Sequence, residues 1–394
     1  MLRITDDERR RRLAVRHGLA RPHPSVEAAT EALTVLHATE AATVHLALWA
    51  RVEDVSVADV DKALYDDRSI VKQLAMRRTL FVFPRALLPA AWGSAAARVG
   101  AQQRALVVKD LRANGITDDP DAWIAAAEAD VLALLADGEP RTTAQIRESV
   151  AMLAGSVVRG NPDSKWGGEV PLAPRVMTML GAEGRLLRAD NAGHWRLNKP
   201  TWTTTSHWLG EVAEPLPQAE GYAALVQRWL WTFGPGTEAD LVWWLGATKT
   251  IVRRALADVA AVEVAFDDGG TGWVLPDDTA PVDGGVEPWA ALLPTLDPTV
   301  MGWKERAFYL DAADTPFLFD SNGNAGNTAW WNGRIVGCWV QDDDARVHLV
   351  LRHDVGADAR AALAREAERL TAWLDGVRIT HVYASPQMRG AVLP

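Results

Sequence analysis

The segment from Val55 to Pro84 reads VSVADVDKALYDDRSIVKQLAMRRTLFVFP. Serine is a good helix cap, so a helix is expected to begin after Ser56. The pair Asp66-Asp67 predicts a turn, and the residues after this pair predict a second helix. The last six residues, TLFVFP, are mostly β-branched or aromatic and predict a strand. Helix, turn, helix and strand are the parts of a winged helix-turn-helix unit.

The same order of elements recurs twice further along the chain. In the second copy, a short helix begins after the capping residue Thr142, and another helix ends near Gly181. A hairpin is then expected, with RLLRA and HWRLN as its strands and residues 190–193 as its turn. In the third copy, the helices GTEADLVWWLG and TKTIVRRALADV precede the strands VEVAF and GWVLP. Three copies at a spacing of roughly 70–90 residues favour tandem winged-helix units over three unrelated segments.

The chain changes character after the third copy, where short strands alternate with Gly, Asn and Asp. Residues 328–341 predict a hairpin around the Asn332-Gly333 turn, and RVHLVLRHDV predicts another strand. Residues 357–376 have an amphipathic pattern closed by glycine and predict a helix. The expected fold is therefore α+β, with three tandem winged-helix units at 1–115, 116–205 and 206–285, followed by a C-terminal β-barrel-like domain at 286–394.

Composition narrows the class of protein. The chain has 394 residues, which predicts several domains, and its 48% hydrophobic residues are typical of globular proteins. The single cysteine, Cys338, excludes a disulfide framework. No apolar run approaches the ~20 residues that a membrane span needs, and the N-terminus lacks the apolar core of a signal peptide. We expect a reduced, cytoplasmic protein that does not enter a membrane.

Charge is distributed unevenly along the chain. The net charge is −10, which by itself argues against nucleic acid as a partner. Residues 1–115, however, contain 18 Lys and Arg against 13 Asp and Glu, whereas the rest contains 23 against 38. Such asymmetry suggests that the N-terminal part meets a polyanion. Chance clustering of solvated arginines is the alternative explanation.

Four segments resemble a known family: LHATEAATVHLALWAR at 36–51, MRRTLFVFP at 76–84, LLPTLDPTVMGWKER at 292–306, and LFDSNGNAGNTAWWNGRIVGCWVQ at 318–341. They are similar to winged-helix DNA-binding proteins that include the YcaQ/AlkZ-like crosslink-repair DNA glycosylases. The resemblance covers nearly the whole chain. It implies three winged-helix units and a C-terminal β-barrel around double-stranded DNA. It also implies excision of alkylated purines, in DNA repair or in resistance to DNA-alkylating compounds.

The resemblance points to a short motif at residues 37–39, in the first unit. Glycosylases of the family carry Gln-x-Gln or Gln-x-Asp, where this chain has His37 and Thr39. It therefore looks like a divergent branch. A neutral imidazole could hold a water molecule or act as a base, Thr39 offers a hydroxyl, and Glu40 could steady a cationic sugar. Alternatively, Thr39 and Glu40 serve free N–H groups at a helix start, and His37 bonds to a backbone carbonyl. His45 is interpreted as a packing or orienting residue.

Two groups of basic residues are candidates for DNA phosphate contacts. One is a run of four arginines near the N-terminus, and the other flanks the expected second helix and wing of the first unit. These residues are Arg9, Arg10, Arg11, Arg12, Lys72, Arg77 and Arg78. A solvated helix face is the alternative for the arginine run. The asparagines of FDSNGNAGN are interpreted as turn formers rather than as a binding loop.

Several cofactors are not expected. The nine histidines are dispersed, and the chain has neither a Walker loop nor a Gly-x-Gly-x-x-Gly motif, so we expect no metal and no nucleotide cofactor. The protein is expected to act as a monomer. Besides a glycosylase, the sequence is compatible with a non-catalytic DNA-binding or regulatory protein that lost the catalytic glutamines. A third possibility is a scaffold that serves a small-molecule or protein partner.

Overall fold

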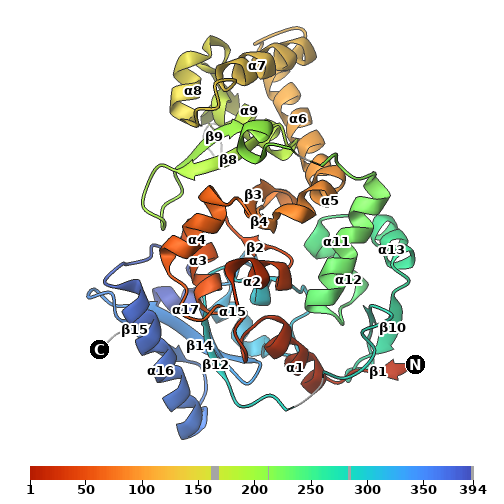
Figure 1. Cartoon of the computed structure of the whole chain (residues 1–394), viewed down its shortest axis with the longest axis vertical. Coiled ribbons are helices and arrows are strands. Elements are labelled where there is room, and N and C mark those ends of the chain that lie inside the picture. The colour runs from red at the N-terminus through yellow and green to blue at the C-terminus, as the bar shows by residue number, and fades with distance from the viewer. Residues whose placement is uncertain (161–167, 212, 283–284, 392–394) are drawn as a thin grey trace.

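The computed structural model describes residues 1–160, 168–211, 213–282 and 285–391, which form a mixed α and β protein (Figure 1). The chain starts with β1 (Leu2–Arg3) and α1 (Asp6–Arg16). Most of the remaining chain forms three consecutive helix-and-strand units and a C-terminal sheet. No helix in the described part of the chain is both long and apolar enough to cross a membrane.

The first unit contains a three-stranded antiparallel sheet with the order β2-β4-β3. Its elements are α2 (Val26–Ala32), β2 (Leu36–His37), α3 (Ala41–Trp49), α4 (Val57–Asp61), β3 (Ile70–Leu74) and β4 (Leu80–Pro84). A capping box between Ser56 and Asp59 starts α4, as the sequence predicted for a helix after Ser56. A single π-helical turn at Lys62–Asp66 prolongs it.

The second helix expected in this unit is wrong, because Ile70–Leu74 is a strand that pairs with β4. Arg77 and Arg78 occupy the tight turn between the two strands, and both have left-handed backbones, with φ of 56° and 58°. The Thr79 N–H closes the turn on the Met76 carbonyl at 3.0 Å. Such turns normally use Asn-Gly, so an Arg-Arg pair conceals the hairpin in the sequence.

The second unit repeats the strand order, as β5-β9-β8. Two helices lead into it, α5 (Leu88–Gly93) and α6 (Ala95–Ala113), and its own elements are α7 (Pro120–Leu134), β5 (Arg141–Thr142), α8 (Thr143–Ser149), β6 (Ser156–Arg159), β7 (Gly168–Pro171), α9 (Leu172–Ala182), β8 (Leu186–Asn191), β9 (Pro200–Thr204) and α10 (Thr205–Leu209). The expected strand HWRLN is wrong, since β9 begins only at Pro200. Asn191 holds that segment as a loop by bonding to the Leu197 carbonyl and the Lys199 N–H, both at 2.8 Å.

The third unit matches the sequence prediction closely. Its elements are α11 (Gln218–Phe233), α12 (Glu238–Leu245), α13 (Lys249–Asp258), β10 (Val262–Ala265) and β11 (Thr271–Val274). Strand β11 pairs with β10 and, on its other side, with Gly236 through a single β-bridge. Strand β1 pairs with the other edge of β10. The third unit therefore has the same arrangement of a short bridge and two strands as the other two.

The C-terminal part is built on a four-stranded antiparallel sheet with the order β12-β13-β14-β15. Its elements are β12 (Ala290–Leu293), α14 (Pro298–Met301), α15 (Thr315–Leu318), β13 (Thr328–Trp331), β14 (Arg334–Gln341), β15 (Val347–Leu351), α16 (Gly356–Leu374) and α17 (Pro386–Arg389). The hairpin at Asn332-Gly333 and the helix closed near Gly376 are confirmed. Among the described strands the sheet is open, with β12 and β15 at its edges, rather than the expected barrel.

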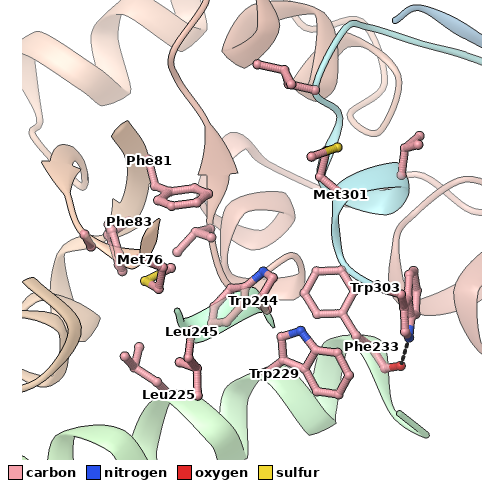
Figure 2. Packing of buried hydrophobic residues seen from close by; sticks show 14 of the residues in the cluster. Met76, Phe81, Phe83, Leu225, Trp229, Phe233, Trp244, Leu245, Met301 and Trp303 are labelled. Atoms are coloured by element: carbon pink, nitrogen blue, oxygen red, sulfur yellow. Dashed lines mark hydrogen bonds between the residues drawn. The ribbon is translucent and has the colours of Figure 1, made fainter. Parts of the chain in front are cut away.

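Packing sets most of the second unit apart from the rest of the chain. Helices α7, α8 and α9 with the β8–β9 hairpin form a lobe at the top of Figure 1, with a hydrophobic core largely of its own. The first and third units instead share a core with the C-terminal part. Figure 2 shows this shared core, whose labelled residues are Met76, Phe81 and Phe83 of the first unit, Leu225, Trp229, Phe233, Trp244 and Leu245 of the third, and Met301 and Trp303. The β3–β4 hairpin is therefore anchored where three parts of the chain meet.

Candidate functional site

His37 lies at the end of the short strand β2, opposite Phe81 of β4. Its side chain is buried, with 6% exposed, and its ring packs on Phe81 at 4.9 Å between centroids. The Thr39 hydroxyl lies 3.5 Å from Nδ1 of His37. The structure thus brings together the two residues at the motif positions, at the edge of the sheet and just before α3.

The environment of His37 favours the neutral imidazole. Burial, with a smaller contribution from the charge of Arg77, lowers the pKa of His37 from 6.5 to about 3. One ring nitrogen is then unprotonated at neutral pH and can accept a hydrogen bond. Chemically, this group can orient a water molecule by accepting a hydrogen bond, but it carries no extra proton at neutral pH and so cannot act as a general acid.

Glu40 has a different set of partners from the one expected for a helix start. It precedes α3, but its side chain makes no capping hydrogen bond. One carboxylate oxygen accepts the backbone N–H groups of Val382 and Tyr383, at 2.6 and 2.9 Å, and the other lies 3.3 Å from Nδ1 of His381. Glu40 therefore fastens the segment before α17 to the start of α3.

Sequence reasoning missed the residues that continue this contact. His381 also meets the Thr295 hydroxyl at 3.0 Å and the Asn327 amide at 3.2 Å. The Asn327 oxygen accepts both the N–H and the hydroxyl of Thr295, at 2.9 and 3.0 Å. Asn327 is thus a structural residue. No local pattern could have revealed a partner more than 300 residues from Glu40.

His45 of α3 takes part in a separate contact. Its Nε2 lies 3.0 Å from an Asp61 oxygen, and its ring packs on Trp195 at 5.0 Å between centroids. Burial lowers its pKa, with a partial offset from Asp61. These contacts agree with a packing role, and they connect α3 to α4 and to the loop of the second unit.

The run of four arginines on α1 is largely committed to contacts within the molecule. Arg12 is 2% exposed and bonds to Glu8 and Asp278, at 3.0 and 2.9 Å. Arg9 lies over the Phe308 ring at 3.7 Å, and Arg10 bonds to Asp7 and to the Phe308 carbonyl. Arg11 is exposed and has no partner among the described residues. A helix places residues 9 and 12 on one face, which here points inward.

The other basic candidates lie on the β3–β4 hairpin. Lys72 donates to the Tyr65 hydroxyl at 2.7 Å, and burial followed by the charge of Arg188 lowers its pKa to about 8. Lys72 and Arg188 line a small cavity of about 30 Å3 between the first and second units. The guanidinium of Arg77 lies 3.9 Å from the centroid of Trp243, and Arg78 is exposed. Arg78 is thus the exposed cation of the hairpin, whereas Lys72 and Arg77 are half-buried.

Comparison with known proteins shows the family to which the chain belongs. A model of the family described as DNA glycosylase AlkZ-like matches residues 30–373, which is most of the chain. The chain belongs to this family. Among solved structures it is similar to the Streptomyces sahachiroi DNA glycosylase AlkZ, with a TM-score of 0.71 over 96% of this chain and 99% of that one. The two sequences are 21% identical, so this likeness concerns the fold. No curated protein matches the chain.

Proposed function

We propose that this protein is a DNA-repair glycosylase that hydrolyses the N-glycosidic bond of N7-alkylated purines, bulky adducts included, in double-stranded DNA. The observation that carries the proposal is a neutral, buried His37 next to Thr39, at the positions where the family resemblance puts catalytic side chains. Membership of the AlkZ-like family supports the reaction class.

The protein needs no strong general acid to protonate the leaving purine. An N7-alkylated purine already carries positive charge, so its bond to the sugar is weak. What remains is to hold a water molecule and to stabilise a sugar with oxocarbenium character. The unprotonated nitrogen of His37 accepts a hydrogen bond from that water, and the Thr39 hydroxyl accepts another. Glu40 acts as a positioning residue, because its carboxylate oxygens already bond to residues 381–383.

The three repeated units are proposed to be winged helices that meet the duplex. Each has helices before a hairpin. In each, the second strand of the hairpin also pairs with a short segment from earlier in the unit, which is β2, β5 or the bridge at Gly236. That arrangement supports a winged helix. The unit boundaries are those expected from the sequence, at 1–115, 116–205 and 206–285, with the open sheet at 286–394. The exposed cations Arg11 and Arg78 contact phosphates, and the protein acts as a monomer.

One observation favours a second function, a DNA-binding protein without catalysis. His37 is only 6% exposed and packs on Phe81, as a purely structural histidine would. Such a protein would bind duplexes in a salt-dependent way and would release no base.

The test is incubation of the protein with a duplex that carries an N7-alkylguanine, followed by alkaline cleavage at the abasic site. We expect strand breaks at the lesion with the wild type and none with His37→Ala, while both proteins bind the duplex equally. A duplex with a bulky adduct is run in parallel. Intact DNA on both substrates, with binding retained, would establish the non-catalytic function instead.

A further inference from the structure

Two arginines from distant parts of the chain lie against one tryptophan ring. The guanidinium of Arg77 is 3.9 Å from the ring centroid of Trp243 on α12. The guanidinium of Arg306, in the segment after α14, is 5.3 Å from the same centroid and 4.8 Å from that of Phe319. The first unit, the third unit and the C-terminal part therefore each contribute one residue to a two-arginine cluster, made of Arg77, Trp243 and Arg306.

Neither arginine of this cluster forms an ion pair within the described residues. Burial and then the charge of Arg306 lower the pKa of Arg77 to about 10, and no carboxylate offsets them. Nε of Arg77 is buried without a hydrogen-bond partner in the described part of the chain. Arg306 donates from Nε to the Val300 carbonyl at 3.1 Å. An anion bound between two like charges stabilises both of them, most of all where they are partly removed from water.

The backbone holds Arg77 in place for such a ligand. Its left-handed conformation, with φ of 56° and ψ of 24°, is unusual for a residue with a side chain. The preceding Met76 is fully buried in the core of Figure 2 and fixes the turn. A Cβ at Gly246 would lie 3.1 Å from Cγ of Arg77, so the glycine that ends α12 leaves room for this side chain.

The cluster and the motif also belong to one sheet, because His37 of β2 pairs with Phe81 of β4, the strand that follows the Arg77-Arg78 turn. After burial, the charge of Arg77 is the second cause of the lowered pKa of His37. A group bound by Arg77 therefore lies at the turn of the hairpin that carries Phe81, the strand partner of His37. The planar forks of two guanidinium groups match the oxygens of a phosphate.

We infer that Arg77 and Arg306 bind one and the same backbone phosphate of the DNA strand whose nucleotide faces His37. The inference deepens the proposed function and rests on it for the identity of the ligand as DNA. The phosphate site itself is argued from the cluster alone. Free inorganic phosphate shares the same chemistry and would bind more weakly to the same two side chains.

The first arm of the test uses inorganic phosphate. The thermal midpoint of unfolding is compared in phosphate and in chloride at equal ionic strength, for the wild type, Arg306→Gln, Arg77→Gln and the control Arg365→Gln. Arg365 is an exposed residue of α16. General salt exclusion stabilises all four proteins alike. We expect an additional increase in phosphate for the wild type and the control, and its loss in the other two. An equal increase in all four would overturn the phosphate site.

The second arm measures the salt dependence of duplex binding by fluorescence anisotropy. One phosphate contributes about 0.9 to the slope of log K against log salt. If both arginines share one phosphate, the double variant Arg77→Gln/Arg306→Gln loses about 0.9 of slope. A loss of about 1.8 would mean two separate phosphates, and an unchanged slope would mean none; either result contradicts the inference. If Arg77→Gln does not fold, Arg306→Gln and Arg77→Lys decide the first arm.

The two arms separate this inference from the proposed function. If the wild type binds duplex DNA and the double variant has the same salt dependence of binding, the proposed function is unaffected, but the cluster has no part in binding DNA. The opposite result is that the wild type binds no duplex at low salt, while the phosphate-specific stabilisation is present in the wild type and absent in Arg306→Gln. In that case the phosphate site is real, but DNA is not its ligand.

Discussion

At the scale of single residues, the proposed chemistry depends on the charge state of His37. A buried imidazole with a pKa of about 3 is neutral over the whole physiological range. Its partner Thr39 is likewise uncharged, so in the proposed reaction the pair acts through hydrogen-bond acceptance alone. In this respect it can do what the amide oxygen of a glutamine does, and a change of residue type does not by itself end the chemistry.

The lowered pKa of His37 makes stability depend on pH. The folded protein binds this proton less tightly than the unfolded chain, so the contribution is fully present above about pH 6.5 and is lost as the pH falls towards 3. Over that window, the unfolding free energy of the wild type should fall by up to about 1.4 kcal/mol per pH unit more than that of His37→Gln. Denaturant titrations at several pH values measure this. Parallel curves for the two proteins would mean that His37 titrates normally.

Glu40 offers a test of positioning against direct catalysis. Glu40→Ala leaves the N–H groups of Val382 and Tyr383 without their acceptor, and we expect it to lower the unfolding free energy by about 2–3 kcal/mol. Glu40→Gln keeps an acceptor oxygen and should recover most of that loss, together with activity. Denaturant unfolding and the excision assay are run on both variants. A fully stable but inactive Glu40→Gln would show that the negative charge itself acts on the substrate.

At the scale of elements, capped helices and Asn-Gly turns were predictable and the Arg-Arg turn was not. Thr142 starts α8 because its hydroxyl caps the helix, and Asn332-Gly333 joins β13 to β14 because both residues readily adopt a positive φ. The strand Ile70–Leu74 was mistaken for a helix, because a turn with no typical turn residues separates it from its partner strand. Local preference fails where tertiary packing, here around Met76 and Phe83, imposes the conformation.

The same turn gives a prediction about stability. Arg78 is exposed, has a φ of 58° and its side chain makes no hydrogen bond within the described residues. Glycine adopts this conformation without steric cost, so Arg78→Gly should raise the unfolding free energy by about 0.5–1 kcal/mol. Urea denaturation measures the change, with Arg365→Gln as a control that alters charge alone. A decrease would indicate that the side chain of Arg78 makes a contact that stabilises the hairpin.

At the scale of the whole molecule, buried polar contacts tie the N-terminal unit to the C-terminal part. Arg51, just after α3, forms a fully buried pair with Asp297 of the C-terminal part at 2.6 Å. Glu40 and the segment before α17 make a second link. The sequence indicated His37 and Thr39 as neighbours, since they are two residues apart. It could not indicate contacts such as these, because chain separation hides them.

The buried pair should be far more important than a surface pair of similar geometry. Asp297→Ala leaves the charge of Arg51 buried without a partner and should cost about 3–5 kcal/mol of unfolding free energy. Asp258→Ala removes an exposed pair with Arg254 at 2.7 Å and should change it by less than about 1 kcal/mol. Denaturant unfolding of both variants gives the comparison. Similar costs would mean that Arg51 finds another partner or reaches water.

The most direct test of the central claim is the single-turnover rate of base excision from an N7-alkylguanine duplex, with protein in excess, for the wild type, His37→Ala and His37→Gln. If a neutral acceptor at position 37 holds the attacking water, His37→Ala should lose excision by a factor of about 10² or more, and His37→Gln should retain it. Both variants should still bind the duplex. Excision by His37→Ala at the wild-type rate would contradict the claim and leave His37 as a packing residue.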